Sequence, residues 1–180
     1  MARIKLQYPE LDEIVNSLFE NINTSFTPDT IIHPGIRTDY LINKARNFFN
    51  QEPYVIDTSR PFPFKRVMRK FFCEYLDSLP EFVTNPLAEA YIKIVHAEKK
   101  KPAVAEEYIE RLPKSLGNVL ILDDVFCTGH TIESISSALL TLEIKEIKTG
   151  VLIFTPRNES KPDYYALEGS YSLPWRNIGI

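Results

Sequence analysis

The chain repeats one pattern twice: a short apolar run, an amphipathic helical stretch and a second apolar run. The first repeat has its apolar runs at residues 30–32 (TII) and 53–57 (PYVID), and the second has them at residues 119–122 (VLIL) and 151–154 (VLIF). Units of strand, helix and strand place their strands parallel, with a right-handed crossover. The pattern therefore predicts an α/β fold, an open, mostly parallel twisted sheet flanked by helices.

The helices are predicted from the spacing of their apolar residues. Residues 9–22 carry apolar side chains at positions i, i+3, i+4 and i+7, a spacing typical of an amphipathic helix. A second helix is predicted to begin with Thr38 or Asp39 as its N-cap. Its predicted core face consists of Leu41, Ile42, Ala45, Phe48 and Phe49. The predicted core face of the helix after the VLIL run consists of Ile132, Ile135, Leu139 and Leu140.

The length and the segments outside the repeats indicate the domain organisation. A chain of 180 residues is long enough for one domain with a proper core, so a single domain is predicted over residues 1–180. Residues 58–117 are predicted to form a helical insertion, with helices at 64–79, 87–96 and 104–112. The tail, residues 156–180, is rich in Pro, Tyr and Gly, and we expect it to form an irregular hood.

Composition excludes several classes of partner. A formal net charge of −3 gives the whole protein no attraction to nucleic acid or to an anionic membrane. No stretch reaches the roughly 18 apolar residues of a membrane span, and the N-terminal sequence lacks a signal-peptide core. Cys73 and Cys127 are too distant for a metal motif and too few for a disulfide framework. We therefore expect a cytoplasmic protein with no membrane partner and, in all but one alternative below, no nucleic-acid partner.

Two adjacent carboxylates, Asp123 and Asp124, follow the VLIL run directly. Such a pair needs a counter-charge, a metal or a ligand able to hydrogen-bond both carboxylates. Ligands of open parallel sheets bind outside the carboxyl ends of the strands. The turn that follows contains Gly129, which can adopt a positive φ. Backbone N–H groups at the helix start, with the hydroxyls of Thr128 and Thr131, suit an anion. A sugar phosphate would satisfy both ends of this stretch.

Competing motifs are absent. The chain has neither the GxxxxGK[ST] phosphate loop nor GxGxxG. A cysteine phosphatase would need an arginine six residues after Cys127, where Glu133 stands. A lone acidic pair would more often only end a strand and cap a helix, but the whole block of apolar strand, acidic pair and small-residue turn favours a ligand site.

This block, LILDDVFCTGHT (residues 120–131), resembles the signature of the type I phosphoribosyltransferases, which use phosphoribosyl pyrophosphate (PRPP). The resemblance implies that Asp123 and Asp124 hold the ribose 2′ and 3′ hydroxyls. It also implies a loop around the 5′-phosphate, formed by Val125, Phe126, Cys127, Thr128, Gly129, His130 and Thr131. Residues 26–42 (FTPDTIIHPGIRTDYLI) resemble the first strand, pyrophosphate loop and next helix of the family, with Arg37 in the loop.

The C-terminal stretch, VLIFTPRNESKPDYYALEGSYSLPW (residues 151–175), resembles the hood of the 6-oxopurine branch of that family. The resemblance implies that Thr155, Trp175 and Cys127 lie near the base, with Trp175 stacked on the base, at its border or packed in the hood. Two positions depart from that branch: Cys127 stands where an aspartate is common, and Thr155 where a lysine is common. The pyrophosphate loop departs too, with GIRT in place of RGG.

The resemblance implies a phosphoribosyltransferase, an enzyme that moves 5-phosphoribose from PRPP to a nitrogenous base and releases pyrophosphate, with purine the favoured base. Asp123, Asp124 and Arg37 are its expected catalytic residues. Mg²⁺ is the expected cofactor, held by Asp123 and Asp124 directly or through water. The expected partners are PRPP, a nucleobase and further copies of the chain in a homo-oligomer.

Two alternatives stay open. A PRPP-binding regulatory protein could keep the fold without transfer, and it would need a nucleic-acid surface. The only candidate surface is a group of five cations, which could instead cover the pyrophosphate or form a solvated helix face: Arg60, Lys65, Arg66, Arg69 and Lys70. In the other alternative the protein is structural, and its acidic loop binds nothing.

Overall fold

The computed structural model describes residues 4–35, 39–59, 103–156 and 159–176. The chain divides into two compact units, residues 1–59 with 102–178 and residues 60–101 with 179–180. The second unit lies outside the described residues, as do the predicted helices 64–79 and 87–96 and the predicted pyrophosphate residue Arg37. Whether the chain folds as a single domain therefore stays a prediction.

The described part is built around one parallel sheet, with the strand order β3-β2-β6-β7-β8. Every pair of neighbouring strands in it is parallel, which confirms the predicted fold class. The strands are β2 (Thr30–His33), β3 (Tyr54–Val55), β6 (Ser115–Phe126), β7 (Glu143–Phe154) and β8 (Tyr164–Glu168).

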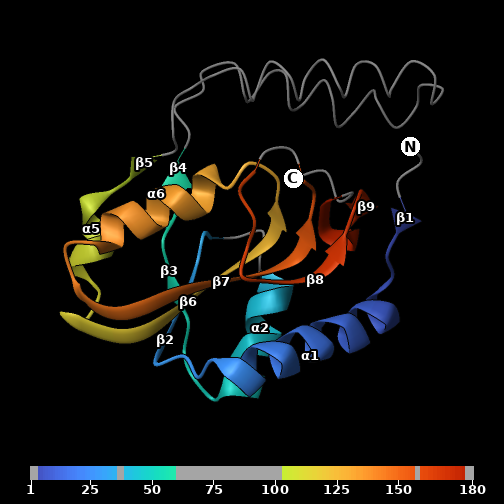
Figure 1. The fold of residues 1–180 in the computed structure, drawn as a ribbon, viewed down its shortest axis with the longest axis horizontal. Helices are drawn as coiled ribbons and strands as arrows, with labels where there is room; N and C mark the ends of the chain where they lie inside the picture. The colour runs from blue at the N-terminus through green and yellow to red at the C-terminus, as the bar shows by residue number, and fades with distance from the viewer. Residues whose placement is uncertain (1–3, 36–38, 60–102, 157–158, 177–180) are drawn as a thin grey trace. The chain divides into compact units, whose positions relative to one another are not determined.

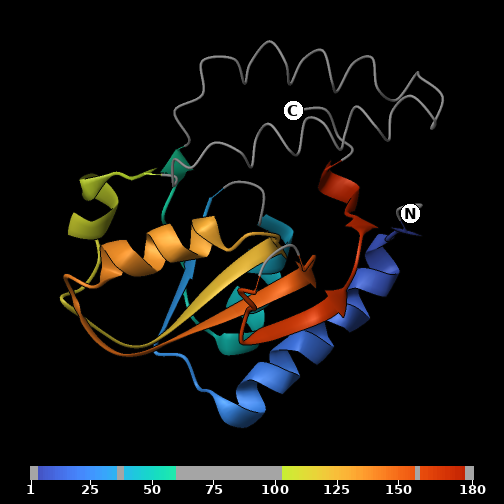
Figure 2. The ribbon, with the colours of Figure 1, turned by 45° about the horizontal axis from the view of Figure 1, so that its top comes forward.

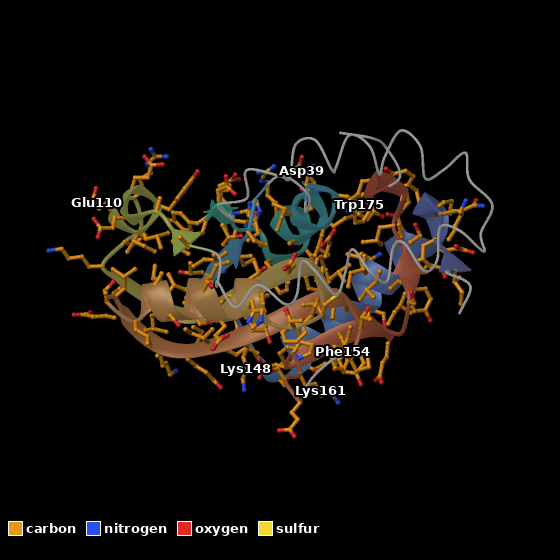
Figure 3. All side chains as sticks on the ribbon, turned by 90° about the horizontal axis from the view of Figure 1, so that it is seen from above. Asp39, Glu110, Lys148, Phe154, Lys161 and Trp175 are labelled. Atoms are coloured by element: carbon orange, nitrogen blue, oxygen red, sulfur yellow. The ribbon has the colours of Figure 1, made fainter. Side chains whose placement is uncertain are left out.

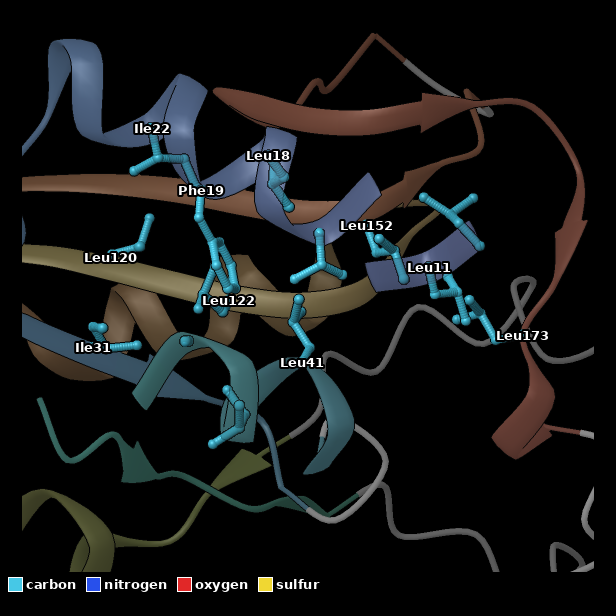
Figure 4. Packing of buried hydrophobic residues seen from close by; sticks show 14 of the residues in the cluster. Leu11, Leu18, Phe19, Ile22, Ile31, Leu41, Leu120, Leu122, Leu152 and Leu173 are labelled. Atoms are coloured by element: carbon cyan, nitrogen blue, oxygen red, sulfur yellow. The ribbon is translucent and has the colours of Figure 1, made fainter. Parts of the chain in front are cut away.

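Helices cover both faces of this sheet (Figure 1). On one face lie α1 (Tyr8–Ser25) and α2 (Asp39–Phe49), and on the other lie α5 (Glu106–Glu110) and α6 (His130–Leu139). The predicted stripe of α1 is confirmed, because Leu11, Val15, Leu18, Phe19 and Ile22 are all buried. Figure 4 shows this stripe packed on Leu120, Leu122 and Leu152 of the sheet.

Two predicted core residues lie at the surface. Leu140 is 77% exposed, because α6 ends at Leu139 and the chain turns there, with the Leu142 N–H donating to the Leu139 carbonyl. Phe48 is also exposed, although its ring lies 5.5 Å from that of Phe19. None of the described helices is long and apolar enough to cross a membrane.

The third predicted strand is longer than expected. Because β7 offers a partner over twelve residues, β6 continues to Phe126, which pairs with Phe154. Asp123 therefore lies within the strand, opposite Val151, and does not begin the turn. The predicted turn over 125–131 is shorter than expected, since α6 already begins at His130.

The prediction of a purely helical insertion is wrong at both of its ends. β4 (Thr58–Ser59) pairs antiparallel with β5 (Ala103–Val104), and β6 begins at Ser115. Of the predicted helix 104–112, α5 covers five residues. β4 and β5 have two residues each and, unlike β3, lie in none of the predicted apolar runs, so the sequence does not reveal them.

The tail is more regular than predicted. Tyr164–Glu168 form β8, the last strand of the main sheet, and β9 (Tyr171–Ser172) pairs parallel with β1 (Ile4–Lys5) at the other end of the chain (Figure 2). A 3-10 helix, η3 (Pro174–Arg176), follows. Tyr164 packs against the core on the α1 side and Tyr165 against the core on the α6 side.

Hydrogen bonds fix the short connection from β7 to β8. Asp163 Oδ2 accepts bonds from the N–H and the hydroxyl of Thr149, each at 2.8 Å, and the Asp163 N–H donates to the Thr149 hydroxyl oxygen. Lys148 Nζ lies 3.3 Å from Asp163 Oδ1 and 3.2 Å from Glu146 Oε1. These contacts hold the start of β8 beside β7 without an intervening helix.

Candidate functional site

The order of the strands identifies the edge where a ligand would bind. From β2 the chain passes to β3 on one side, and from β6 it passes to β7 on the other, so the order reverses between β2 and β6. In open parallel sheets ligands bind outside the carboxyl ends of the strands at such a point. The loops that follow β2 and β6 therefore flank the candidate site, and residues 36–38 of the first loop lie outside the described residues.

The two aspartates near the end of β6 have different surroundings. Successive side chains of a strand point to opposite faces of the sheet, so the carboxylates of Asp123 and Asp124 diverge. Asp124 is 2% exposed, whereas Asp123 is partly exposed. Asp123 Oδ1 accepts the N–H of Asp124 at 2.8 Å. Divergence reduces the repulsion that the adjacent charges would otherwise cause.

A tight turn joins β6 to α6. Gly129, the N-cap of α6, has φ 76° and ψ −6°, a left-handed conformation that a side chain disfavours. A Cβ at this position would lie 2.8 Å from Cζ of Phe126, closer than van der Waals contact allows. Only glycine fits this turn. The first N–H groups of α6 have no acceptor within the helix, so they face the turn, where an anion could accept from them.

The other side chains of the turn are half-buried. Cys127, Thr128 and Thr131 are all partly exposed. His130 is 38% exposed, and its Nδ1 lies 3.5 Å from Glu133 Oε2 within the first turn of α6. The turn therefore offers hydroxyl and backbone donors at the carboxyl end of β6.

Thr155, directly after β7, hydrogen-bonds to the last residue of β6 and to the residue after β8, at the carboxyl end of the sheet. Its N–H donates to the carbonyl of Phe126, and its hydroxyl donates to the carbonyl of Gly169, both at 2.8 Å. The residue predicted to face the base thus lies at the ends of β6 and β7, with its hydroxyl proton directed to the backbone after β8.

Trp175 reaches the site from η3 (Figure 3). Its indole Nε1 donates to Asp124 Oδ2 at 3.2 Å. Its ring lies 5.2 Å from that of Tyr40, at an interplanar angle of 32°, and 6.5 Å from that of Tyr8. The structure therefore brings Trp175 together with Asp124, 51 residues away in sequence.

A polar cluster between α1 and α2 was not predicted from the sequence. The Tyr40 hydroxyl donates to Asp12, and Lys44 Nζ lies 2.7 Å from Asp12 Oδ1. The hydrogen bond with Lys44 is the main reason why the pKa of Asp12 is lowered, and burial is the main reason why the pKa of Tyr40 is raised. Tyr40 and Lys44 are four residues apart, which suggests a common helix face, but nothing local in the sequence points to Asp12.

A buried histidine was also not predicted from the sequence. His33 is the last residue of β2 and is 5% exposed. Its Nδ1 accepts the Gly35 N–H at 3.4 Å, and Gly35 has φ 107°. Burial of the imidazole lowers the pKa of His33.

At this edge the structure brings together Asp123, Asp124, the turn to α6, Thr155 and Trp175. Within the described residues, no group of three or more His, Cys, Asp or Glu side chains could hold a metal ion. A metal here would therefore need ligands from a bound substrate or from water in addition to the protein.

Comparisons with solved structures agree with this fold. A purine phosphoribosyltransferase from Pyrococcus horikoshii Ot3 has a TM-score of 0.62 at 22% identity, over 97% of this chain and 94% of that one. A xanthine-guanine-hypoxanthine phosphoribosyltransferase from Helicobacter pylori has a TM-score of 0.66 at 10% identity, with the same coverage. A hypothetical protein from Neisseria gonorrhoeae with bound ppGpp has a TM-score of 0.58 at 17% identity, over 97% and 90%. These likenesses show the fold.

Among curated proteins no sequence matches the chain significantly. The family model "Phosphoribosyl transferase domain" matches residues 63–180, more than half of the chain. This match confirms the family that residues 120–131 resemble, and with it the assignment to the phosphoribosyltransferases. The chain belongs to the phosphoribosyl transferase domain family.

Proposed function

We propose that the protein transfers 5-phosphoribose from PRPP to a purine base and releases pyrophosphate. One observation carries the proposal: at the point where the strand order reverses, β6 presents Asp123 and Asp124 and then turns through left-handed Gly129 into α6. Sugar-binding carboxylates and a phosphate-binding helix start thus follow each other directly. The purine part is supported by the similarity to the purine and xanthine-guanine-hypoxanthine enzymes.

In this proposal the two ends of PRPP bind to different parts of the edge. The 5′-phosphate accepts hydrogen bonds from the first N–H groups of α6 and from the hydroxyls of Thr128 and Thr131. The ribose hydroxyls donate to the carboxylates of Asp123 and Asp124, which hydrogen-bond more strongly than neutral acceptors because they are charged. Arg37, in the loop after β2, would contact the pyrophosphate.

The proposed reaction requires the protein to position PRPP and the base, and it requires no covalent bond to the protein. The C1–oxygen bond to pyrophosphate breaks, with its electron pair leaving on pyrophosphate, and a ring nitrogen of the base forms the new bond to C1 and loses its proton. Positive charge develops on the ribose as this bond breaks, so fixed carboxylates beside the sugar stabilise the transition state. By binding the 5′-phosphate, the turn from β6 to α6 would fix the position of the ribose C1 relative to the base.

The residues present fit Mg²⁺ as a cofactor that binds together with the substrate. Within the part of the chain that the structure describes, no third His, Cys, Asp or Glu joins the two carboxylates, which suits Mg²⁺, an ion that keeps several waters and takes phosphate oxygens as ligands. Asp123 and Asp124 would hold it directly or through water. When bound, the ion would neutralise charge on the leaving pyrophosphate.

Cys127 and Thr155 would lie nearest the base. A thiol is a weak hydrogen-bond donor, and the Thr155 hydroxyl already donates to Gly169. Recognition of the base would therefore depend more on backbone groups and shape than on charged side chains. The predicted cytoplasmic location and homo-oligomer remain part of this proposal.

The test is pyrophosphate release from PRPP and Mg²⁺ with a panel of purine and pyrimidine bases. We expect release with one or more purines, and its loss in the double variant Asp123→Asn/Asp124→Asn. A matched control, Glu106→Gln/Glu107→Gln, removes the same two charges from exposed positions of α5 and should leave the rate unchanged. Release with no base would contradict transfer.

A second function is favoured by Cys127 and Thr155, the two positions that differ from the residues common in the 6-oxopurine branch. A PRPP-binding regulatory protein needs the sugar-phosphate site but no contact with a base. It would bind PRPP and Mg²⁺ with loss of affinity in the double variant, and it would release no pyrophosphate with any base of the panel.

A further inference from the structure

Asp124 is 2% exposed, although it carries a charge at the edge where we propose that the sugar binds. A buried carboxylate requires hydrogen-bond donors. Trp175 supplies one of them, through its Nε1–H at 3.2 Å from Oδ2. Because an indole has one donor and no acceptor, this bond commits the entire hydrogen-bonding capacity of Trp175 to Asp124.

The position of Trp175 is set by other parts of the fold. Its ring packs on Tyr40 of α2 and near Tyr8 of α1. Leu173, two residues earlier, is fully buried, and β9 just before it pairs with β1. Contacts that do not involve Asp124 therefore fix the position of the indole. The indole N–H can in turn fix the orientation of the Asp124 carboxylate.

The donor that Trp175 supplies to Asp124 is neutral, and this matters for the charge of the site. Lys44, whose Nζ lies 5.8 Å from the centre of the Tyr40 ring, is paired with Asp12, which also accepts from the Tyr40 hydroxyl. A lysine or arginine in place of Trp175 would neutralise Asp124 by forming an ion pair. An indole N–H orients the carboxylate without adding a positive charge beside it.

We infer that Trp175 is a positioning residue of the sugar site, which orients the Asp124 carboxylate for ribose and links this site to α1, α2 and the hood. The inference rests on the proposed function. It assigns Trp175 to PRPP binding, where the family resemblance pointed to stacking on the base or packing.

Trp175→Phe tests this role, because it keeps an aromatic ring and removes only the N–H donor and part of the ring. We expect the KM for PRPP to rise by about tenfold, the loss of one hydrogen bond to a charged group, with the KM for the base within about twofold. Tyr108→Phe, on α5, serves as the control for an aromatic change outside the site. An unchanged KM for PRPP with a raised KM for the base would overturn the inference.

A double-mutant cycle separates positioning from a general loss of packing. In an Asp124→Ala background, Trp175→Phe should add little to the loss of PRPP affinity, because the acceptor that Trp175 positions has already been removed. Additive losses in the double variant would overturn the inference, since they would mean that Trp175 acts independently of Asp124.

Fluorescence gives a readout in the unaltered protein. The chain has one tryptophan, so its emission reports on the surroundings of this indole alone, and we expect it to shift when PRPP and Mg²⁺ saturate the protein. Wild-type protein that binds no PRPP would overturn the proposed function together with this inference. PRPP binding with no change in emission, and with equal affinity in Trp175→Phe, would overturn the inference alone.

Discussion

Asp123 and Asp124 explain how a chain can keep two charges next to each other at the end of an apolar run. The extended backbone sends their carboxylates to opposite faces, so one is buried against Trp175 and the other is partly exposed. The residue types and their place after a buried strand were enough to predict a ligand site here. Their separation into two environments was not predictable, because it depends on how far β6 continues.

Gly129→Ala should weaken the binding of PRPP. The change introduces a side chain at φ 76°, a strain of about 1–2 kcal/mol, and a Cβ 2.8 Å from the ring of Phe126. The turn must open to relieve the contact, which moves the first N–H groups of α6. We expect the KM for PRPP to rise at least about tenfold. Ser137→Ala, at an exposed position of α6, should have no effect, and equal KM values for the two variants would refute this role for Gly129.

His33 should make the stability of the protein depend on pH. Burial lowers its pKa in the folded state, so between that pKa and about 6.5 the unfolded chain binds more protons than the folded one. The free energy of unfolding should therefore fall as the pH decreases below about 6.5 and be constant, for this group, above it.

The measurement is urea unfolding at two pH values, about 7.5 and 5.5, for wild type and His33→Gln. We expect wild type to lose more stability than the variant on acidification, by at most about 1.4 kcal/mol, the limit for one proton over one pH unit. The same pH dependence in both proteins would show that His33 does not contribute it.

Strands and helices differ in how much of them the sequence reveals. The apolar runs of β2, β6 and β7 and the stripe of α1 were predicted because burial imposes a regular spacing. β1, β4, β5 and β9 have two residues each, and their partners are distant in the chain, so no local pattern marks them. β8 was missed because its link to β7 is made by side-chain hydrogen bonds rather than by a helix.

Asp163→Ala should loosen β8. The carboxylate accepts two hydrogen bonds from Thr149, and their loss from this exposed connection should cost about 1–2 kcal/mol of unfolding free energy. Thermal unfolding should therefore occur at a lower temperature than in wild type. Glu159→Ala removes an exposed carboxylate from the same connection and should leave the midpoint unchanged. A variant as stable as wild type would mean that strand pairing alone holds β8.

Across the molecule, a strand near the start of the described residues pairs with a strand near their end. β1 pairs with β9, and η3 then carries Trp175 to Asp124. Sugar-phosphate binding is therefore expected to depend on the N-terminal residues and the hood as well as on the β6–α6 turn. The sequence indicated that the hood reaches the site, by resemblance, but the contacts of Trp175 with Tyr40 and Asp124 depend on the folded chain.

The most direct test of the account is a calorimetric titration of the protein with PRPP in the presence and absence of Mg²⁺. We predict saturable binding at one site per chain, strengthened by Mg²⁺ and lost in Asp123→Asn/Asp124→Asn, with Glu106→Gln/Glu107→Gln binding as wild type does. Absence of binding in wild type, or equal binding in the double aspartate variant, would contradict the claim that the end of β6 and the turn to α6 hold PRPP.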